Sequence, residues 1–265
     1  MIGLPVIGSF LTMPHSKPKA RLFVDAALGP GAGVGLDAGQ AHYLDRVMRL
    51  AASDAVLVFN GRDGEWRARL EDGGGKRRAL AVDRQTRAQA AEPGPWLAFA
   101  PLKKTPMDFV AVKATELGVS RLLPVFTRRT AARRVATARL RANAREAAEQ
   151  CGRLSVPEVV EPVDLQALLA QWPAGRRLLV PDESGGGVPL ARALAKAAPD
   201  DHAFLIGPEG GFAPDELDAL RKLPFVTAVG LGPRILRADT AALATLAAWQ
   251  ALVGDWHDGP PPSDR

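Results

Sequence analysis

The feature that most constrains the fold is an alternation of short apolar runs and helical segments that begins at Trp96 and continues nearly to the end of the chain. Apolar runs typical of buried strands occupy residues 97–100, 121–126, 178–180, 203–206 and 226–231. Helical segments occupy residues 107–117, 139–151, 165–171, 190–197, 214–220 and 240–253. This alternation of strand and helix segments predicts an α/β domain in which helices cover a parallel sheet.

The later helices carry clear end signals. Pro214, followed by two acidic residues, suits a first turn, where a missing N–H is harmless and negative charge favours the helix dipole. Asp239 or Thr240 is expected to cap the last helix, and Gly254 to end it. Because that helix is apolar almost all round, we expect it to be buried on several sides by its own domain or, in the alternative, by another subunit.

Two loops in this domain carry unusual chemistry. They are residues 205–211 (LIGPEGG) and 230–240 (GLGPRILRADT), and each follows an apolar run and leads into a helix. If the two strands are adjacent and parallel, the loops form one crevice at the carboxyl edge of the sheet, where open α/β sheets bind ligands. Glycine and proline give the backbone unusual dihedrals and allow a close approach to a ligand. The two loops therefore predict the active site.

Neither loop has the pattern of a dinucleotide-binding fingerprint or of a phosphate-binding P-loop. The first loop suits an uncharged adenine edge or a cationic group met by backbone carbonyls; the alternative is a tight turn with Glu209 in solvent. In the second loop, Arg234, Arg237 and Asp239 suit a polyanion held beside an acid or base. Its alternative is a surface Arg–Asp pair with a helix cap, which contributes at most about 1 kcal/mol.

The preceding part of the chain predicts a smaller domain at residues 21–88, built as a closed β-barrel. Strands are expected at residues 21–25, 55–60, 65–70 and 77–84. The Asn60-Gly61 and Asp63-Gly64 pairs indicate a hairpin between the second and third strands. A helix at residues 40–50 interrupts them, with His42, Arg46 and Arg49 on one face and Leu44, Val47 and Leu50 pointing inward.

The segments outside these two domains are predicted to be irregular. Residues 1–20 are expected to be a disordered extension or, in the alternative, to include a mis-called start, with Met13 as the true initiator and order beginning near Arg21. Residues 85–95 are expected to be a linker and residues 257–265 a flexible tail. A lone cysteine excludes a disulfide framework and fits a reducing cytoplasm. The four histidines show no metal-ligand spacing, and no charge-free apolar run reaches the length of about 18 residues that a membrane span needs.

Positive charge is concentrated between Arg121 and Arg153, although the net charge of the whole chain is only +5. The arginines of this region are Arg121, Arg128, Arg129, Arg133, Arg134, Arg139, Arg141, Arg145 and Arg153. Guanidinium groups bind phosphates with two donors at a time, so this density favours a nucleic-acid partner over a merely solvated basic face.

Several of these segments together resemble one family. The matching pieces are residues 21–24 (RLFV) with His42, Arg46 and Arg49; Lys103 with 113–119 (KATELGV); 149–153 (EQCGR); 205–211; and 231–240. In this order and spacing, which runs from Arg21 to Gly254, the chain resembles the bacterial 16S rRNA (uracil-N3)-methyltransferases of the SPOUT superfamily. Asp239 stands where that family more often has glutamate.

The resemblance implies an N-terminal PUA-like barrel that holds RNA and a C-terminal methyltransferase domain, residues 96–256, with a deep trefoil knot. It further implies a homodimer that transfers a methyl group from S-adenosylmethionine to N3 of a specific uridine in 16S rRNA, within the assembled small ribosomal subunit and without a metal. The knot runs against the general rule that connections do not thread through loops.

Roles for individual residues follow from the resemblance and from the reaction. Arg237, and after it Arg234, is expected to stabilise the uracil anion, and Asp239 or Glu209 to accept the N3 proton. Residues expected to hold the cofactor are Leu205, Ile206, Gly207, Pro208, Glu209, Gly210, Gly211, Gly230, Leu231, Gly232, Ile235, Leu236, Arg237 and Thr240. Residues expected to contact RNA are Arg21, Arg46, Arg49, Lys103, Arg128, Arg129 and Arg153.

Two other functions fit the same sequence. One is a non-catalytic RNA-binding or ribosome-assembly factor, which would bind RNA in a salt-sensitive way and would not bind the cofactor. The other is a SPOUT methyltransferase that acts on another base or on ribose.

Overall fold

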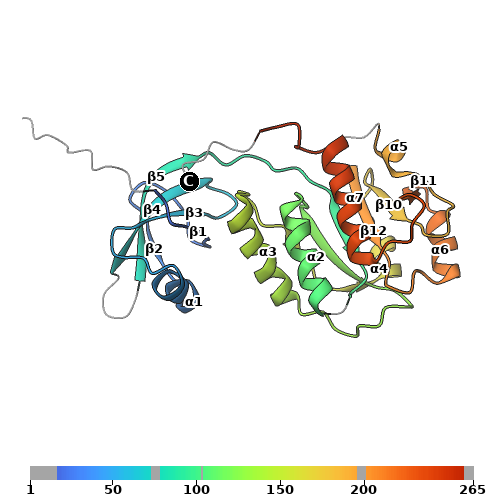
Figure 1. Ribbon diagram of the computed structural model, residues 1–265, viewed down its shortest axis with the longest axis horizontal. Coiled ribbons are helices and arrows are strands. Elements are labelled where there is room, and N and C mark those ends of the chain that lie inside the picture. Colours follow the sequence, from blue (N-terminus) through green and yellow to red (C-terminus); the bar gives the residue numbers. More distant parts are fainter. Residues whose placement is uncertain (1–16, 73–77, 103, 196–200, 260–265) are drawn as a thin grey trace, which may run out of the picture. The chain divides into compact units, whose positions relative to one another are not determined.

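The computed structural model describes residues 17–72, 78–102, 104–195 and 201–259 (Figure 1). The chain divides into two compact units, one that extends to Ala88 and one that begins at Gln89. The segments expected to be irregular at the two ends, residues 1–20 and 257–265, lie mostly outside the described residues. No helix in the described part of the chain is long and apolar enough to cross a membrane.

The N-terminal unit contains a single mixed sheet. Its elements are β1 (Ala20–Phe23), β2 (Gly33–Gly35), α1 (Ala38–His42), the π-helix η1 (Tyr43–Val47), β3 (Ala55–Phe59), β4 (Glu65–Asp72) and β5 (Arg78–Arg87). The sheet order is β1-β3-β4-β5-β2, and within the described residues no ladder joins β1 to β2 and closes the predicted barrel. The predicted hairpin is confirmed: β3 and β4 are antiparallel, and Asn60 Oδ1 accepts the N–H groups of Arg62 and Asp63 at 3.1 and 2.9 Å.

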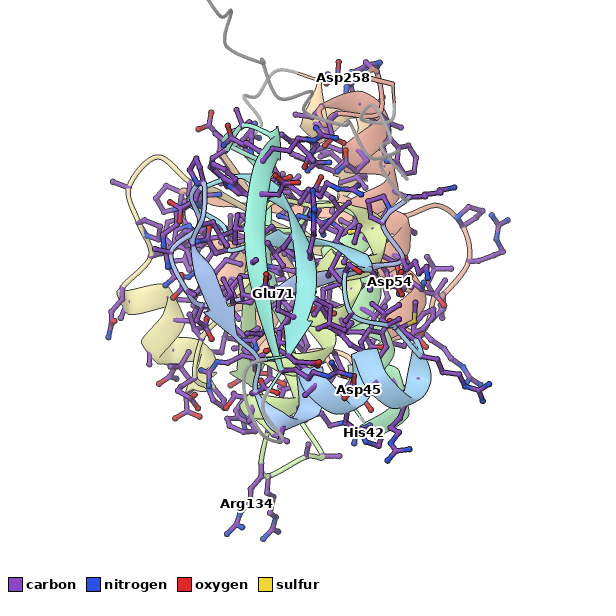
Figure 2. The ribbon with its side chains drawn as sticks, turned by 90° about the vertical axis from the view of Figure 1, so that its left-hand side faces the viewer. His42, Asp45, Asp54, Glu71, Arg134 and Asp258 are labelled. Atoms are coloured by element: carbon purple, nitrogen blue, oxygen red, sulfur yellow. The ribbon has the colours of Figure 1, made fainter. Side chains whose placement is uncertain are left out.

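The helix expected at residues 40–50 is α-helical only at its start and continues as η1. Leu44 and Leu50 are buried as predicted, but Val47 is 61% exposed, so its predicted inward orientation is wrong. A wide turn, in which the Met48 N–H reaches the Tyr43 carbonyl at 2.9 Å, adds a residue to the helical repeat and moves the following side chains out of phase. His42 lies on the solvent side of this segment (Figure 2).

The C-terminal unit confirms the predicted α/β fold with a parallel sheet. Its elements are β6 (Trp96–Phe99), α2 (Lys104–Glu116), β7 (Arg121–Phe126), α3 (Thr137–Cys151), β8 (Glu158–Val159), β9 (Val163–Asp164), α4 (Leu165–Ala170), β10 (Arg177–Pro181), β11 (Val188–Pro189), α5 (Leu190–Leu194), β12 (His202–Ile206), α6 (Pro214–Arg221), β13 (Val226–Gly230) and α7 (Ala238–Leu252). The sheet order is β11-β13-β10-β12-β6-β7-β8, with β9 also paired to β7, and every ladder among the described residues is parallel.

Helices cover both faces of this sheet, and alternate strand residues feed two separate cores. Leu97 and Phe99 of β6 pack with α2, α3, α5 and α7, whereas Ala98, between them, packs on the face that α4 and α6 cover. The two-residue strands β8, β9 and β11 were not expected, because two residues are too few to show a strand pattern.

The order of the central strands corrects one expectation. The strands before the two glycine-containing loops, β12 and β13, are not adjacent, because β10 lies between them and pairs with both. Chain order does not fix neighbours in a parallel sheet, since crossover connections can pass over a strand. The carboxyl ends of three strands therefore meet at this edge of the sheet.

The last helix, α7, lies against α2, α5 and β12, in agreement with its apolar sequence. It begins at Ala238, so Arg237 occupies the cap position, and the Arg237 side chain makes no capping bond. The prediction that Asp239 or Thr240 caps this helix is therefore wrong, because both lie within its first turn. At its other end, the Trp249 carbonyl accepts the N–H groups of Val253 and Gly254 at 2.8 and 3.0 Å. Gly254 thus lies just beyond the helix, as predicted.

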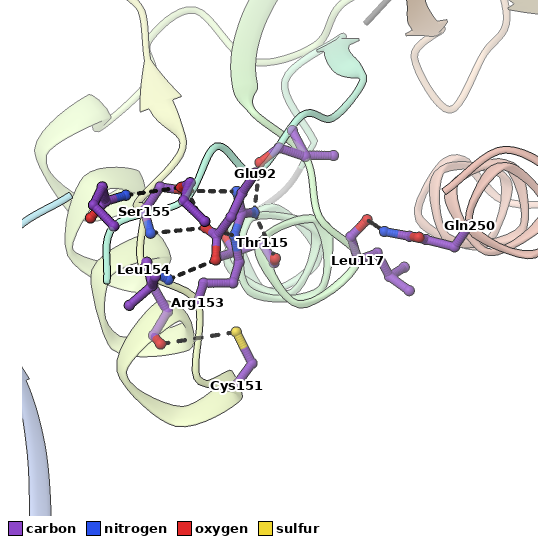
Figure 3. Close-up of polar contacts among 12 residues, drawn as sticks. Glu92, Thr115, Leu117, Cys151, Arg153, Leu154, Ser155 and Gln250 are labelled. Carbon is purple, nitrogen blue, oxygen red and sulfur yellow. Dashed lines mark hydrogen bonds and ion pairs between the residues drawn. The ribbon is translucent and has the colours of Figure 1, made fainter. Parts of the chain in front are cut away.

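A carboxylate fastens the segment before β6 to the end of α3 (Figure 3). Glu92 accepts the N–H groups of Leu154 and Ser155 at 2.8 and 2.9 Å and pairs with Arg153. The Arg153 guanidinium also donates to the carbonyls of Thr115 and Val119 at 3.0 and 2.8 Å. This network joins the linker, α2 and α3.

A buried histidine lies where β12 begins. His202 is fully buried, and its Nδ1 accepts the Trp249 Nε1–H at 3.2 Å. Its Nε2 has no partner among the described residues. Burial, and after it the positive charge of Arg177, lowers the pKa of His202 from 6.5 to about 4.

This histidine makes stability depend on pH. Between pH 6.5 and about 4 the unfolded chain binds a proton that folded His202 does not, so the free energy of unfolding falls as the pH falls through this window. We expect a loss of about 2 kcal/mol between pH 7.5 and pH 5 that is absent in His202→Gln, measured by urea unfolding. Equal pH dependence in the two proteins would contradict the assignment.

Candidate active site

A cavity of about 870 Å³ lies at the carboxyl ends of β10, β12 and β13. Its volume is in the range of pockets that bind small organic molecules. The residues that line it are Pro181, Asp182, Glu183, Ser184, Gly185, Ile206, Gly207, Pro208, Glu209, Gly211, Phe212, Pro214, Leu217, Asp218, Arg221, Gly230, Leu231, Gly232, Pro233, Arg234, Ile235, Leu236, Arg237, Ala238 and Ala241.

Most of the residues expected in the site line this cavity, but four do not. Leu205 is fully buried in the core on the α4 and α6 side of the sheet. Gly210 lies outside the lining, and its carbonyl accepts a bond from Arg129 at 3.0 Å. Asp239 and Thr240 are in the first turn of α7, where Asp239 Oδ1 accepts the Thr240 N–H at 2.7 Å.

The loop after β10 was not among the predicted site residues. It contributes the stretch from Pro181 to Gly185, and it is in the site because β10 lies between the two predicted strands. Its sequence signal was visible: an expected strand is followed by an acidic pair and a run of three glycines. The same arrangement after a strand is what identified the other two loops.

Asp182 organises this loop. Its side chain is 1% exposed, and its carboxylate accepts the Ser184 N–H and Oγ–H at 2.9 and 2.7 Å and an Arg221 N–H at 2.6 Å. Burial alone would raise the pKa of Asp182, but the bonds from Ser184 and Arg221 outweigh it and hold the pKa below its usual value. The ion pair between Asp182 and Arg221 joins the loop after β10 to the end of α6, which also lines the cavity.

The loops contribute four further charged side chains to the cavity, and these are of two kinds. Glu183 and Glu209 come from the loops after β10 and β12, and Arg234 and Arg237 come from the loop after β13. Within the described residues, none of the four side chains makes an ion pair or hydrogen bond, so the alternative of an Arg–Asp surface pair is not observed. Acidic groups thus lie on two loops and basic groups on the third.

Glycines keep the backbone of the cavity open. Gly211 and Gly232 have φ of +66° and +99°, a left-handed region that other residues rarely adopt. At Gly207 a Cβ atom would lie 2.9 Å from the Phe212 ring, so a side chain there would force the ring to shift. The mouth also carries Ile235, which is 81% exposed.

An arginine-containing loop is fastened beside the cavity. The Arg128 N–H donates to Glu216 Oε1 at 2.8 Å, and its guanidinium pairs with Asp215. Glu216 Oε2 also accepts the Ala213 N–H at 3.0 Å, at the start of α6. Further along this loop Arg134 projects outward (Figure 2).

The arginines expected to contact RNA fall into two groups. Arg46, Arg49, Arg128 and Arg129 are exposed. Arg21 is instead 7% exposed in an ion pair with Glu65 at 2.6 Å, so the structure gives it an internal role in the N-terminal unit.

Arg153 likewise has an internal role: its side chain is 10% exposed and is held by the Glu92 network. Sequence alone cannot separate these two arginines from the exposed ones, because their partners are distant in the chain. Lys103, also expected to contact RNA, lies outside the described residues.

Comparison with known families gives two matches. Residues 92–250 match the RNA methyltransferase domain family, and residues 36–83 match the RNA methyltransferase PUA domain family. The first match covers most of the C-terminal unit, including the cavity.

Known proteins match over nearly the whole chain. Ribosomal RNA small subunit methyltransferase E of Rickettsia conorii is 29% identical, over 88% of this chain and 95% of its own. The protein of the same name from Synechocystis is 30% identical, over 96% of this chain and 86% of its own. A crystal structure of ribosomal RNA small subunit methyltransferase E from Neisseria gonorrhoeae, bound to S-adenosylmethionine, has a TM-score of 0.80 and 28% identity, and the match covers 89% of this chain and 99% of that one.

The two acceptor bonds of Glu216 generate a prediction. Glu216→Ala removes the acceptor of the Ala213 N–H and that of the Arg128 N–H, so we expect the free energy of unfolding to fall by about 1–2 kcal/mol. Urea unfolding measures the loss, and trypsin should cleave faster after Arg128 and Arg129. Glu146→Ala, on the exposed side of α3, is the control. Indistinguishable stabilities would show that Glu216 does not fasten the loop.

Proposed function

The chain belongs to the RNA methyltransferase family, and on that premise we propose that it transfers a methyl group from S-adenosylmethionine to N3 of a specific uridine in 16S rRNA. The observation that carries the proposal is the cavity at the carboxyl ends of β10, β12 and β13, inside the domain that matches this family. The resemblance of the chain to the uracil-N3 methyltransferases supports the position on the base.

The cavity fits the cofactor in size and in the chemistry of its walls. About 870 Å³ is ample for a nucleoside with an amino-acid side arm, and glycines at 207, 211 and 232 leave backbone groups accessible. Backbone groups from Ile206 to Pro208 and from Gly230 to Leu236 would hold it. When bound, S-adenosylmethionine supplies a methyl group that its sulfonium charge has already activated. The protein mainly has to align the reacting atoms.

The chain's own residues must deal with the proton on uracil N3, which makes that nitrogen a poor nucleophile. Arg237, and after it Arg234, would stabilise the negative charge that develops on the uracil oxygens. Glu209 would accept the proton, since its carboxylate lines the cavity and has no partner in the described part of the chain. Asp239 is the weaker candidate because it lies outside the lining and accepts the Thr240 N–H.

RNA would be held by exposed arginines of both units. Arg46 and Arg49 of the PUA-like unit, and Arg128 and Arg129 beside the cavity, would neutralise phosphates. The N3 atom is on the pairing edge of uracil, so the target must be unpaired or turned out of its helix. We propose that residues 21–88 form a dedicated RNA-binding domain and that the reaction takes place in residues 96–256, with the small ribosomal subunit as the substrate particle.

The proposal includes a trefoil knot and a homodimer, as the resemblance implies. Sedimentation equilibrium of the purified protein measures the oligomeric state, and a monomer at micromolar concentration would contradict the dimer.

Incubation with labelled S-adenosylmethionine and small subunits from a strain that lacks uridine N3 methylation tests the function. An N3 methyl group blocks pairing, so primer extension should stop at one uridine only when the protein is present. Label without such a stop would move the reaction to another position. RNA binding without cofactor binding would favour the non-catalytic alternative.

Arg237→Ala tests the catalytic assignment. The rate of methyl transfer should fall about a hundredfold or more, because the charge developing on uracil loses its partner. The unfolding transition should not move, since the exposed Arg237 side chain makes no hydrogen bond or ion pair in the described residues. Single-turnover kinetics measure the rate, and Arg192→Ala, at an exposed position of α5, is the matched control. A rate near that of the wild type would remove Arg237 from the mechanism.

A further inference from the structure

Within the proposed function, on which this inference rests, we propose that Glu183 is a specificity residue that makes the cavity prefer S-adenosylmethionine to the product, S-adenosylhomocysteine. The two molecules differ by one methyl group and one positive charge, since the product contains a neutral thioether. A carboxylate in the cavity distinguishes them by charge.

Glu183 lies between two of the loops that form the cavity. It is on the loop after β10, and a Cβ atom built on Gly211 would overlap its Oε1 atom. The carboxylate therefore lies directly over the glycine-containing loop after β12. Glycine suits position 211 for two reasons: its φ of +66° is left-handed, and it has no side chain to displace the Glu183 carboxylate.

The negative charge of Glu183 is not neutralised by the protein. Its neighbour Asp182 is buried and paired with Arg221 at 2.6 Å, so the charge of Asp182 is neutralised by that ion pair, which holds the loop in place. Glu183 makes no ion pair or hydrogen bond among the described residues, and its side chain is exposed to the cavity. Arg234 and Arg237 come from the loop after β13. Glu183 is thus available to a cationic ligand.

The second unpaired carboxylate, Glu209, has a different task in the proposed reaction. Glu209 must exchange a proton with the base, whereas Glu183 is required only to remain charged. A lasting negative charge in the cavity strengthens binding of the cationic substrate in every turnover and leaves binding of the neutral product nearly unchanged. Opposite charges about 4 Å apart change a binding constant about fivefold in water and more in a less polar cavity.

Isothermal titration calorimetry with each ligand tests this inference on the full-length protein. The wild type should bind S-adenosylmethionine more tightly than S-adenosylhomocysteine. Glu183→Gln, which keeps the shape and removes the charge, should weaken binding of S-adenosylmethionine about five- to tenfold and leave S-adenosylhomocysteine within about twofold. Glu183→Asp should keep the preference. Glu146→Gln, which removes the same charge from α3, should match the wild type.

Salt gives a second readout, because the attraction between charges is screened. The preference of the wild type should shrink as salt is raised, whereas that of Glu183→Gln should not change. Equal weakening of both ligands would mean that Glu183 only shapes the loop, and unchanged affinities would mean that it does not sense the charge; either result overturns the inference while the proposed function stands. Failure of the wild type to bind either ligand would overturn the proposed function and this inference together.

Discussion

The parallel pairing of β10 with both β12 and β13 is the constraint on which the rest of the site depends. Leu178 of β10 is in register with Ala203 of β12 and with Val226 of β13, so the three strands end at one edge of the sheet. All three then turn into glycine-containing loops around one cavity. Because the strands are buried in two cores, their ends are fixed more firmly than the loops alone could be. A rigid sheet thus positions a site whose walls are mostly loops, with parts of α6 and α7 beside them.

The charges around this cavity serve two purposes that the structure keeps apart. Asp182 and Arg221 neutralise each other and hold a loop in place, and hydrogen bonds from Ser184 and Arg221 keep the pKa of Asp182 below its usual value despite its burial. Glu209 and Arg237 have no such partners among the described residues, which leaves them for ligands. Arginines of the N-terminal and C-terminal units divide in the same way, since Arg21 is buried in an ion pair while Arg46 is exposed. Residue type therefore indicates the chemistry available, and burial decides whether a ligand can use it.

Periodicity in the sequence was sufficient to predict the helices and most strands of the C-terminal unit, because each buries a regular apolar pattern. The position of β10 between β12 and β13 was not predictable, since it depends on a crossover connection. For the same reason the loop that begins at Pro181 was missed, although its glycines were visible. The prediction that Val47 points inward was wrong, because a single wide turn changes the phase of the helix. In each case the missing information was a contact between residues distant in sequence, or a local departure from regular geometry.

The bonds of Glu92 have a consequence for how this architecture is inherited. Glu92 lies before the first strand of the sheet, yet its carboxylate satisfies two backbone N–H groups beyond the end of α3. The C-terminal unit therefore carries part of its connecting segment as an integral piece, and a recombination that cut at Trp96 would leave those donors without their acceptor. A gene fusion or domain exchange that preserved the fold would have to join upstream of Glu92. The joint at which evolution can replace the N-terminal module is thus set by the hydrogen bonds of Glu92 and not by the edge of the sheet.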